Sequence, residues 1–200
     1  YGWDWGPRLV TSGIWRPVSL ISWNDFRIKD FNIKYTFDSL AYISVNTTIE
    51  SSIKTPNANI IIKLNDSIAY SSDLKLVVGE KKHVSHFKID NPKLWWPNGM
   101  GEQYLYDFKV ELVNKKNKRL ANQKLGLRTI ALEVKDSTQA PNFFFKVNGL
   151  PVFTKGVNYI PQDVFLPRVT NNDYLKLLLA VADANMNMIR VWGGGVYEDD

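Results

Sequence analysis

The chain has 200 residues, of which 44% are hydrophobic, enough to bury the core of one large domain or of slightly more than one. It contains no cysteine, which excludes a disulfide scaffold and a cysteine-ligated zinc site. The net charge is +5, but the densest basic run, residues 115–119, lies between two strand-like segments, where a solvated turn explains it. Nucleic-acid binding is therefore not expected, and no apolar run approaches the roughly 18 residues of a membrane span.

The first 24 residues are rich in tryptophan and glycine and should end in a strand over Arg16–Trp23, where apolar and polar residues alternate. The unusual part is the segment Gly2–Pro7, in which two tryptophans flank one aspartate. Asp4 can accept hydrogen bonds from two sugar hydroxyls while Trp5 offers an apolar face to a sugar ring. A structural loop in which Asp4 is a capping residue explains the same spacing.

Residues 25–132 read as short strands separated by turn signals. About seven strands at this spacing predict an immunoglobulin-like β-sandwich of roughly 100 residues. The expected strands are 26–36, 41–50, 58–65, 72–78, 82–89, 104–113 and 121–128. Inside this stretch, the loop Leu94–Gly99 carries a tryptophan pair. Packing of that pair between domains is favoured over surface sugar binding.

The pattern changes after residue 132. Asn148-Gly149 stands between Phe143–Val147 and Pro151–Phe153, which predicts a tight hairpin. A short strand is then expected over Lys155–Tyr159, followed by a loop with two prolines over residues 160–169.

Thr170 and Asp173 have the spacing of a capping box, which predicts a helix beginning after Thr170. The apolar residues of that helix fall on one stripe: Leu175, Leu178, Leu179, Ala182 and Met186. A buried-type strand is expected over Asn187–Trp192, and it ends at Gly193–Gly195. Strand, helix and strand form a βαβ unit, so residues 133–200 are expected to open a (β/α)8 barrel that remains incomplete.

Functional residues of such barrels lie where the strands end and in the loops that follow. That rule selects Asn158, Tyr159 and Asp163 after the first strand, and Arg190 and Trp192 at the end of the second. A charge within an apolar strand is costly unless it is paired. Arg190 either orders neighbouring carboxylates as a buried structural residue or holds a catalytic carboxylate ionised. Trp192 either packs in the core or, because glycines follow it, offers an open indole face to a sugar.

The sequence does not contain the residue patterns that metal binding, phosphate binding or carboxylate catalysis would require. His83 and His86 alternate with apolar residues in a predicted strand, so a solvent-facing pair is expected rather than a metal site. No pair of acidic residues is placed at the ends of opposed barrel strands, and a solvated loop explains the acidic cluster at Glu198–Asp200. The glycine run at Gly193–Gly195 lacks the Lys-Ser/Thr of a phosphate-binding loop. We therefore expect no metal, no cofactor and no catalytic carboxylate within this stretch.

Several motifs, taken in chain order, resemble the β-mannosidases of glycoside hydrolase family 2. Their positions are Gly2–Pro7 with Ser12–Arg16, Leu94–Gly99 with Gln103–Tyr106, Gly126–Arg128, Phe145–Gly149 with Lys155–Asn158, and Met188–Glu198. The resemblance implies that residues 1–24 end a jelly-roll sugar-binding domain, 25–132 form the sandwich and 133–200 begin the catalytic barrel. Because the chain opens inside one motif and stops without an ending signal, we expect an internal stretch of a longer protein.

The resemblance also implies roles for individual residues. Asp4 would bond mannose hydroxyls, with Trp5 beside it, and Trp192 would line the subsite that holds the sugar. Arg190 would lie beneath the nucleophile, and Asn158 would form part of the pocket wall. The relatives often have tryptophan where Tyr159 stands, which puts an aromatic contact there in doubt.

The implied activity is that of a retaining, exo-acting hydrolase of terminal non-reducing β-D-mannose. Its two catalytic glutamates would lie on later strands, so this stretch should be inactive alone. The expected partners are a β-mannoside oligosaccharide or glycan and the rest of the chain's own barrel, in a periplasmic or other extracytoplasmic compartment. The alternatives are another family 2 glycosidase, of the β-galactosidase or β-glucuronidase type, and a non-catalytic carbohydrate-binding or spacer sandwich.

Overall fold

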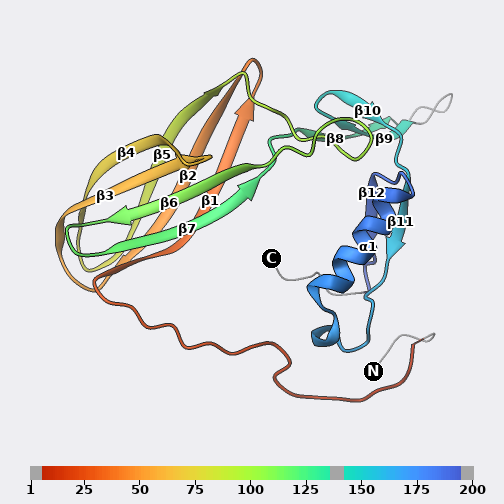
Figure 1. Cartoon of the computed structure of the whole chain (residues 1–200), viewed down its shortest axis with the longest axis horizontal. Coiled ribbons are helices and arrows are strands. Elements are labelled where there is room, and N and C mark those ends of the chain that lie inside the picture. The colour runs from red at the N-terminus through yellow and green to blue at the C-terminus, as the bar shows by residue number, and fades with distance from the viewer. Residues whose placement is uncertain (1–5, 136–141, 195–200) are drawn as a thin grey trace. The chain divides into compact units, whose positions relative to one another are not determined.

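The computed structural model describes residues 6–135 and 142–194 (Figure 1). It is mainly β, and its contacts divide it into two compact units. One unit, called the sandwich unit below, comprises Ile21–Trp95 and Gln103–Arg128. The other, called the βαβ unit, comprises Tyr1–Leu20, Trp96–Glu102 and Thr129–Asp200.

The sandwich unit consists of seven antiparallel strands in two sheets, visible as two layers in Figure 1. One sheet has the order β1-β2-β5 and the other the order β4-β3-β6-β7. The strands are β1 (Phe26–Phe37), β2 (Leu40–Ser51), β3 (Thr55–Leu64), β4 (Ser67–Leu76), β5 (Gly79–Asp90), β6 (Tyr106–Val113) and β7 (Lys118–Leu125). Each of the seven strands expected between residues 25 and 132 is present.

Alternation along the strands builds the core between the two sheets. In β2 every second residue from Ala41 to Ser51 is buried, and in β3 Ile60 and Ile62 are fully buried. They pack in one cluster with buried residues of β6 such as Phe108. Burial of such side chains contributes about 1.5–3 kcal/mol each relative to exposure, so this core dominates the stability of the unit.

The strand β4 begins five residues earlier than the sequence pattern predicts. Asn65 and Asp66 both have positive φ, at 48° and 69°, as the two central residues of a type I′ hairpin turn require. Pairing therefore resumes at once, with Ser67 opposite Leu64. The first residues of β4 are mostly polar and do not alternate with apolar ones, so the sequence pattern does not indicate that the strand already begins at the turn.

The strand predicted over Arg16–Trp23 is wrong. These residues form no strand, and Val18 and Leu20 are 81% and 99% exposed. Alternation predicts a strand only when a second strand offers hydrogen-bond partners, and the described part of the chain provides none here.

The βαβ unit opens with a three-stranded sheet of β8 (Ile130–Lys135), β9 (Asn142–Val147) and β10 (Leu150–Val152) in the order β10-β9-β8. The hairpin predicted at Asn148-Gly149 is confirmed, with φ of 49° and 79° at its two turn residues. The sequence did not indicate β8, which pairs along its whole length with β9.

The predicted strand, helix and strand are confirmed. β11 (Gly156–Tyr159) pairs in parallel with β12 (Met188–Val191), and α1 (Asn171–Asp183) lies between them in sequence. A short 3-10 helix, η1 (Leu166–Arg168), precedes α1. Two strands do not close a barrel, and among the described residues there is none.

Local hydrogen bonds mark the start of α1 as the sequence predicts. The Thr170 hydroxyl accepts from the backbone N–H of Asp173, and the Asp173 carboxylate accepts from the backbone N–H of Thr170. The expected apolar stripe follows, but Leu175, Leu178 and Leu179 are each about half exposed. In the part of the chain that the structure describes, no helix has the length and apolarity to cross a membrane.

A partly buried ion triad lies on the four-stranded sheet. The Glu111 side chain is 8% exposed and accepts from the Nζ atoms of Lys118 at 2.9 Å and Lys63 at 3.0 Å. Lys118, and with it Lys63, lowers the pKa of Glu111 below its ordinary value of 4.5. A carboxyl whose pKa is lower in the folded state stabilises that state above the unfolded pKa and loses this contribution as the pH falls.

We therefore expect Glu111→Gln to lower the free energy of unfolding at pH 7 by about 1–2 kcal/mol. The deficit should shrink as the pH falls below about 4.5, because the carboxyl of unfolded wild-type protein takes up a proton there and, at still lower pH, so does that of the folded protein. Urea denaturation of both proteins at pH 7 and pH 3.5 measures this. Glu80→Gln is the matched control, because the Lys29–Glu80 pair is 44% and 47% exposed and should contribute little. Equal losses in the two variants would refute the importance of the buried triad.

Candidate functional site

Two of the predicted site residues meet across the parallel ladder. In the register of β11 and β12, Asn158 stands opposite Arg190, and Nη1 of Arg190 donates to Oδ1 of Asn158 at 3.2 Å. Sequence reasoning placed both residues near strand ends. The pairing itself depends on the register, which the sequence does not reveal.

Alternation along the strands separates Tyr159 from this pair. Asn158 and Arg190 are exposed on one face, whereas Tyr159, one residue further along, has only 8% of its surface exposed. Its backbone carbonyl accepts from the N–H of Trp192 at 2.9 Å, which extends the ladder one residue beyond β12. The Tyr159 backbone therefore takes part in the ladder, and its side chain lies away from the Asn158–Arg190 face.

Arg190 is more accessible than an apolar strand suggests. It is exposed, and among the described residues no carboxylate lies within ion-pair distance of it. The expectation of a buried arginine rested on the apolar neighbours, which lie mainly on the other face. An exposed guanidinium held by a neutral amide keeps its full positive charge available to an anionic group.

Trp192 lies against the glycine two residues further on. A Cβ built on Gly194 would come within 2.3 Å of Cη2 and 2.4 Å of Cζ2 of the Trp192 indole. At Gly193, by contrast, nothing lies within 4 Å of such a Cβ. Gly194 thus supplies a surface on which part of the ring rests, and an indole face open to a sugar stays a prediction.

The loop after β11 is ordered by one carboxylate. Asp163 accepts from the backbone N–H of Phe165 at 2.7 Å and from Nε and Nη2 of Arg168 at 2.9 and 2.6 Å. The Arg168 guanidinium lowers the pKa of Asp163, and it also lies over the Phe165 ring, 5.0 Å from its centroid. Asp163 therefore organises the loop as an ionised acceptor and is a poor proton donor.

This loop meets the N-terminal segment of the same unit. A hollow of about 570 Å³ lies between residues 11–15, which include Trp15, and residues 164–167, which include Phe165. Asp4 and Trp5, the predicted sugar-binding pair, lie outside the described residues. Residues 11–15 thus approach the loop that follows β11.

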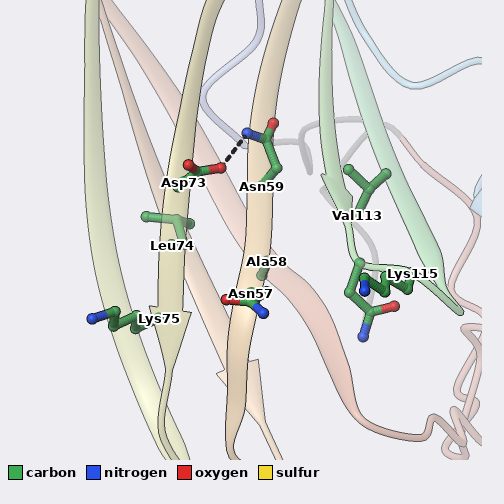
Figure 2. A pocket seen from close by; sticks show the side chains of 9 residues that line it. Asn57, Ala58, Asn59, Asp73, Leu74, Lys75, Val113 and Lys115 are labelled. Carbon is green, nitrogen blue, oxygen red and sulfur yellow. Dashed lines mark hydrogen bonds between the residues drawn. The ribbon is translucent and has the colours of Figure 1, made fainter.

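A second hollow, of about 580 Å³, lies on the sandwich unit (Figure 2). Asn59 and Asp73 face each other across two strands, with Nδ2 of Asn59 donating to Oδ1 of Asp73 at 3.1 Å. Its other lining residues are Asn57, Ala58, Leu74, Lys75, Val113, Asn114 and Lys115. With no aromatic ring to stack on a sugar, this hollow does not match the predicted chemistry.

Each member of the tryptophan pair has a packing contact within its own unit, and the packing of the pair between domains stays a prediction. Trp95 lies against Gly126, where a Cβ would come within 2.7 Å of its side chain, and under the Arg128 guanidinium. Trp96 lies against Gly101, where the corresponding distance is 2.8 Å. Both indoles thus serve packing.

Among the described residues, no group of three or more possible ligands could hold a metal ion.

Comparison with known proteins identifies the family. The sequence profile of the glycosyl hydrolases family 2 matches residues 25–128, more than half of the chain. The chain belongs to this family. The resemblance read from the sequence motifs is thereby confirmed.

Relatives of this glycosyl hydrolase chain match it from end to end. The β-mannosidase of Capra hircus is 38% identical, covering 100% of this chain and 24% of that protein, and β-mannosidase B of Aspergillus niger is 33% identical with the same coverage. The crystal structure of the β-D-mannosidase from Dictyoglomus thermophilum is 38% identical, with a TM-score of 0.88 over 99% of this chain and 25% of that one. This chain therefore spans about a quarter of the length of these relatives.

The contact between Trp192 and Gly194 predicts a difference between adjacent glycines. In the whole protein, Gly194→Ala should push the Trp192 indole aside, because a methyl group cannot occupy a site 2.3 Å from ring carbon. Gly193→Ala, with open space around its Cβ, should leave the ring in place. Fluorine NMR of protein labelled with 5-fluorotryptophan would detect a shifted Trp192 resonance, assigned with Trp192→Phe. The same response in both variants would contradict the proposed contact.

Proposed function

We propose that this chain is part of a retaining, exo-acting β-mannosidase that hydrolyses terminal non-reducing β-D-mannose residues of an oligosaccharide or glycan. The chain would supply one wall of the mannose pocket, and the catalytic glutamates would come from residues outside it. The observation that carries the proposal is the Asn158–Arg190 pair at adjacent parallel strands, in a chain whose curated relatives are named β-mannosidases.

Retaining glycosidases need two carboxyl groups about 5–5.5 Å apart, one of which is an ionised nucleophile. A guanidinium beside that nucleophile would keep its pKa low, and the exposed guanidinium of Arg190 would take this role. Asn158 would hold the guanidinium by its amide oxygen. Asp4 would accept hydrogen bonds from mannose hydroxyls, while Trp5 and Trp192 would line the sugar's apolar face, with Tyr159 behind the wall.

The same proposal assigns the architecture. Residues 1–24 would end a jelly-roll sugar-binding domain. Residues 25–132 would be the immunoglobulin-like sandwich, and 133–200 the start of a (β/α)8 barrel. The half-exposed stripe of α1 and the free side of β12 would then be covered by the rest of that barrel. Substrates of this kind favour a periplasmic or other extracytoplasmic location.

We expect the whole protein to hydrolyse aryl β-mannosides with a kcat/KM at least about 100-fold above that for β-galactosides or β-glucuronides, since a site built for one hydroxyl pattern leaves polar groups unpaired with another. Proton NMR should show that β-mannose is released first. Residues 1–200 alone should give no turnover. A preference for another glycoside would indicate a different family 2 glycosidase, and sugar binding without any hydrolysis would indicate a non-catalytic module.

The predicted sugar contacts can be tested one at a time in the whole protein. Asp4→Asn should lower kcat/KM for the β-mannoside by about 10- to 100-fold, because hydrogen bonds to a charged acceptor contribute about 1.5–3 kcal/mol. Trp192→Ala should also lower it, and Trp192→Phe should lower it less because part of the apolar face remains. Asp30→Asn, at an exposed position of β1, is the matched control and should be neutral. Unchanged kinetics in Asp4→Asn would refute the assigned role of this carboxylate.

A further inference from the structure

An asparagine from the loop between β5 and β6 bonds to the last turn of helix α1 and to the turn that follows it. Nδ2 of Asn98 donates to the carbonyl oxygens of Met186 at 3.0 Å and of Ala182 at 3.3 Å. Ala182 lies in the last turn of α1, where its carbonyl also accepts from the backbone N–H of Asn185 at 2.9 Å, whereas Met186 lies beyond the helix. Asn98 therefore joins the last turn of α1 to the turn that leads into β12. Asn98 lies in residues 96–102, which belong to the same compact unit as α1.

The loop that carries Asn98 is itself closely packed. The Trp96 indole lies on Gly101, and the backbone N–H of Trp96 donates to the carbonyl of Glu102 at 3.0 Å. The N–H of Met100 donates to the carbonyl of Pro97 at 3.0 Å, which forms a tight turn around Asn98. Asn98 is therefore presented from a rigid support.

A second asparagine begins strand β12. Oδ1 of Asn187 accepts from the backbone N–H of Lys155 at 2.9 Å, and its Nδ2 donates to the carbonyl of Phe153 at 3.1 Å. Its backbone N–H donates to the carbonyl of Lys155 at 2.8 Å. These three bonds join residue 187 to the segment that leads into β11, one residue before the ladder begins.

We propose that Asn98 and Asn187 are positioning residues of the mannose pocket, a role that rests on the proposed function. Asn98 holds the turn between α1 and β12, and Asn187 fixes where β12 starts relative to β11. The register of that ladder sets Arg190 opposite Asn158 and brings Trp192 to the Tyr159 carbonyl. Because a slip of one residue turns every side chain to the other face, the two amides determine which residues reach the pocket.

The test uses Asn98→Asp in the whole protein, a change that keeps the shape of the side chain and replaces its donor by an acceptor facing two carbonyl oxygens. We expect kcat/KM for an aryl β-mannoside to fall between about 10-fold and 100-fold, with a raised KM, because small displacements of binding groups have effects of this size. Amide hydrogen exchange should accelerate at residues 186–192 and stay unchanged in strands β1–β7. Asn98→Ala removes the donor without adding charge and should show the same pattern more weakly.

Two further variants sharpen the result. Asn187→Asp keeps the acceptor for Lys155 and loses the donor to Phe153, so it should have a smaller effect than Asn187→Ala. Asn122→Asp, at an exposed position of β7, makes the same chemical change away from α1 and should match the wild type.

An unchanged KM together with unchanged exchange at residues 186–192 in Asn98→Asp would overturn the proposal, even if the melting temperature falls. A wild-type protein without β-mannoside hydrolysis would instead refute the proposed function. The exchange measurement would still decide whether Asn98 holds β12.

Discussion

The parallel ladder between β11 and β12 is the constraint on which the candidate site depends. A shift of β12 by one residue would set Ile189 or Val191 opposite Asn158 in place of Arg190. The entrance of this ladder is packed to backbone contact, since a Cβ on Gly156 would lie 2.3 Å from the carbonyl oxygen of Met188. Its exit carries the polar pair. The same register thus produces both the close backbone approach at Gly156 and the side-chain pairing of Asn158 with Arg190.

The two units are stabilised by different means. The sandwich unit buries a continuous apolar cluster between its sheets, so its hydrophobic core suffices to explain its order. Helix α1, in contrast, has no buried residue. Its ends are defined by polar groups instead: the capping box of Thr170 and Asp173 at one end, and at the other the backbone N–H groups of Asn185 and Met186, which donate to carbonyls of the last turn. These local bonds set the helix boundaries without help from a core, which is why a βαβ unit with a half-exposed stripe still has a defined register.

The sequence predicted most of the strands and the helix, but few of the contacts between them. Strong alternation and an explicit turn or cap revealed the seven sandwich strands, the hairpin at Asn148-Gly149 and the helix after Thr170. The early start of β4 was missed because a type I′ turn at Asn65-Asp66 starts pairing before any alternation is visible. The strand expected before Trp23 failed for the opposite reason, since alternation was present but no described strand pairs with it.

For the candidate site, too, the sequence predicted the positions of residues better than their contacts. Strand ends identified Asn158, Arg190 and Trp192, because position in a strand can be read from periodicity. The separation of Tyr159 from Asn158 followed from alternation alone and was foreseeable. The contacts of the Asn98 and Asn187 amides could not be predicted, because an asparagine in a loop gives the same sequence signal whether it faces solvent or bonds to a neighbouring segment. The contact of Gly194 with Trp192 likewise required coordinates, since a glycine run indicates freedom of the backbone and not what lies beside it.

The choice of a neutral partner for Arg190 has an electrostatic consequence. Had an aspartate stood at residue 158, the pair would neutralise itself, and an arriving carboxylate would meet no net charge. An asparagine orients the guanidinium through one bond of 3.2 Å and leaves its charge intact. Opposite charges about 4 Å apart attract by about 1 kcal/mol in bulk water but by about 4 kcal/mol at the lower effective dielectric constant near a protein surface. On the proposed function, Arg190 acquires its full influence on a carboxylate only when the rest of the barrel closes over this face and excludes water.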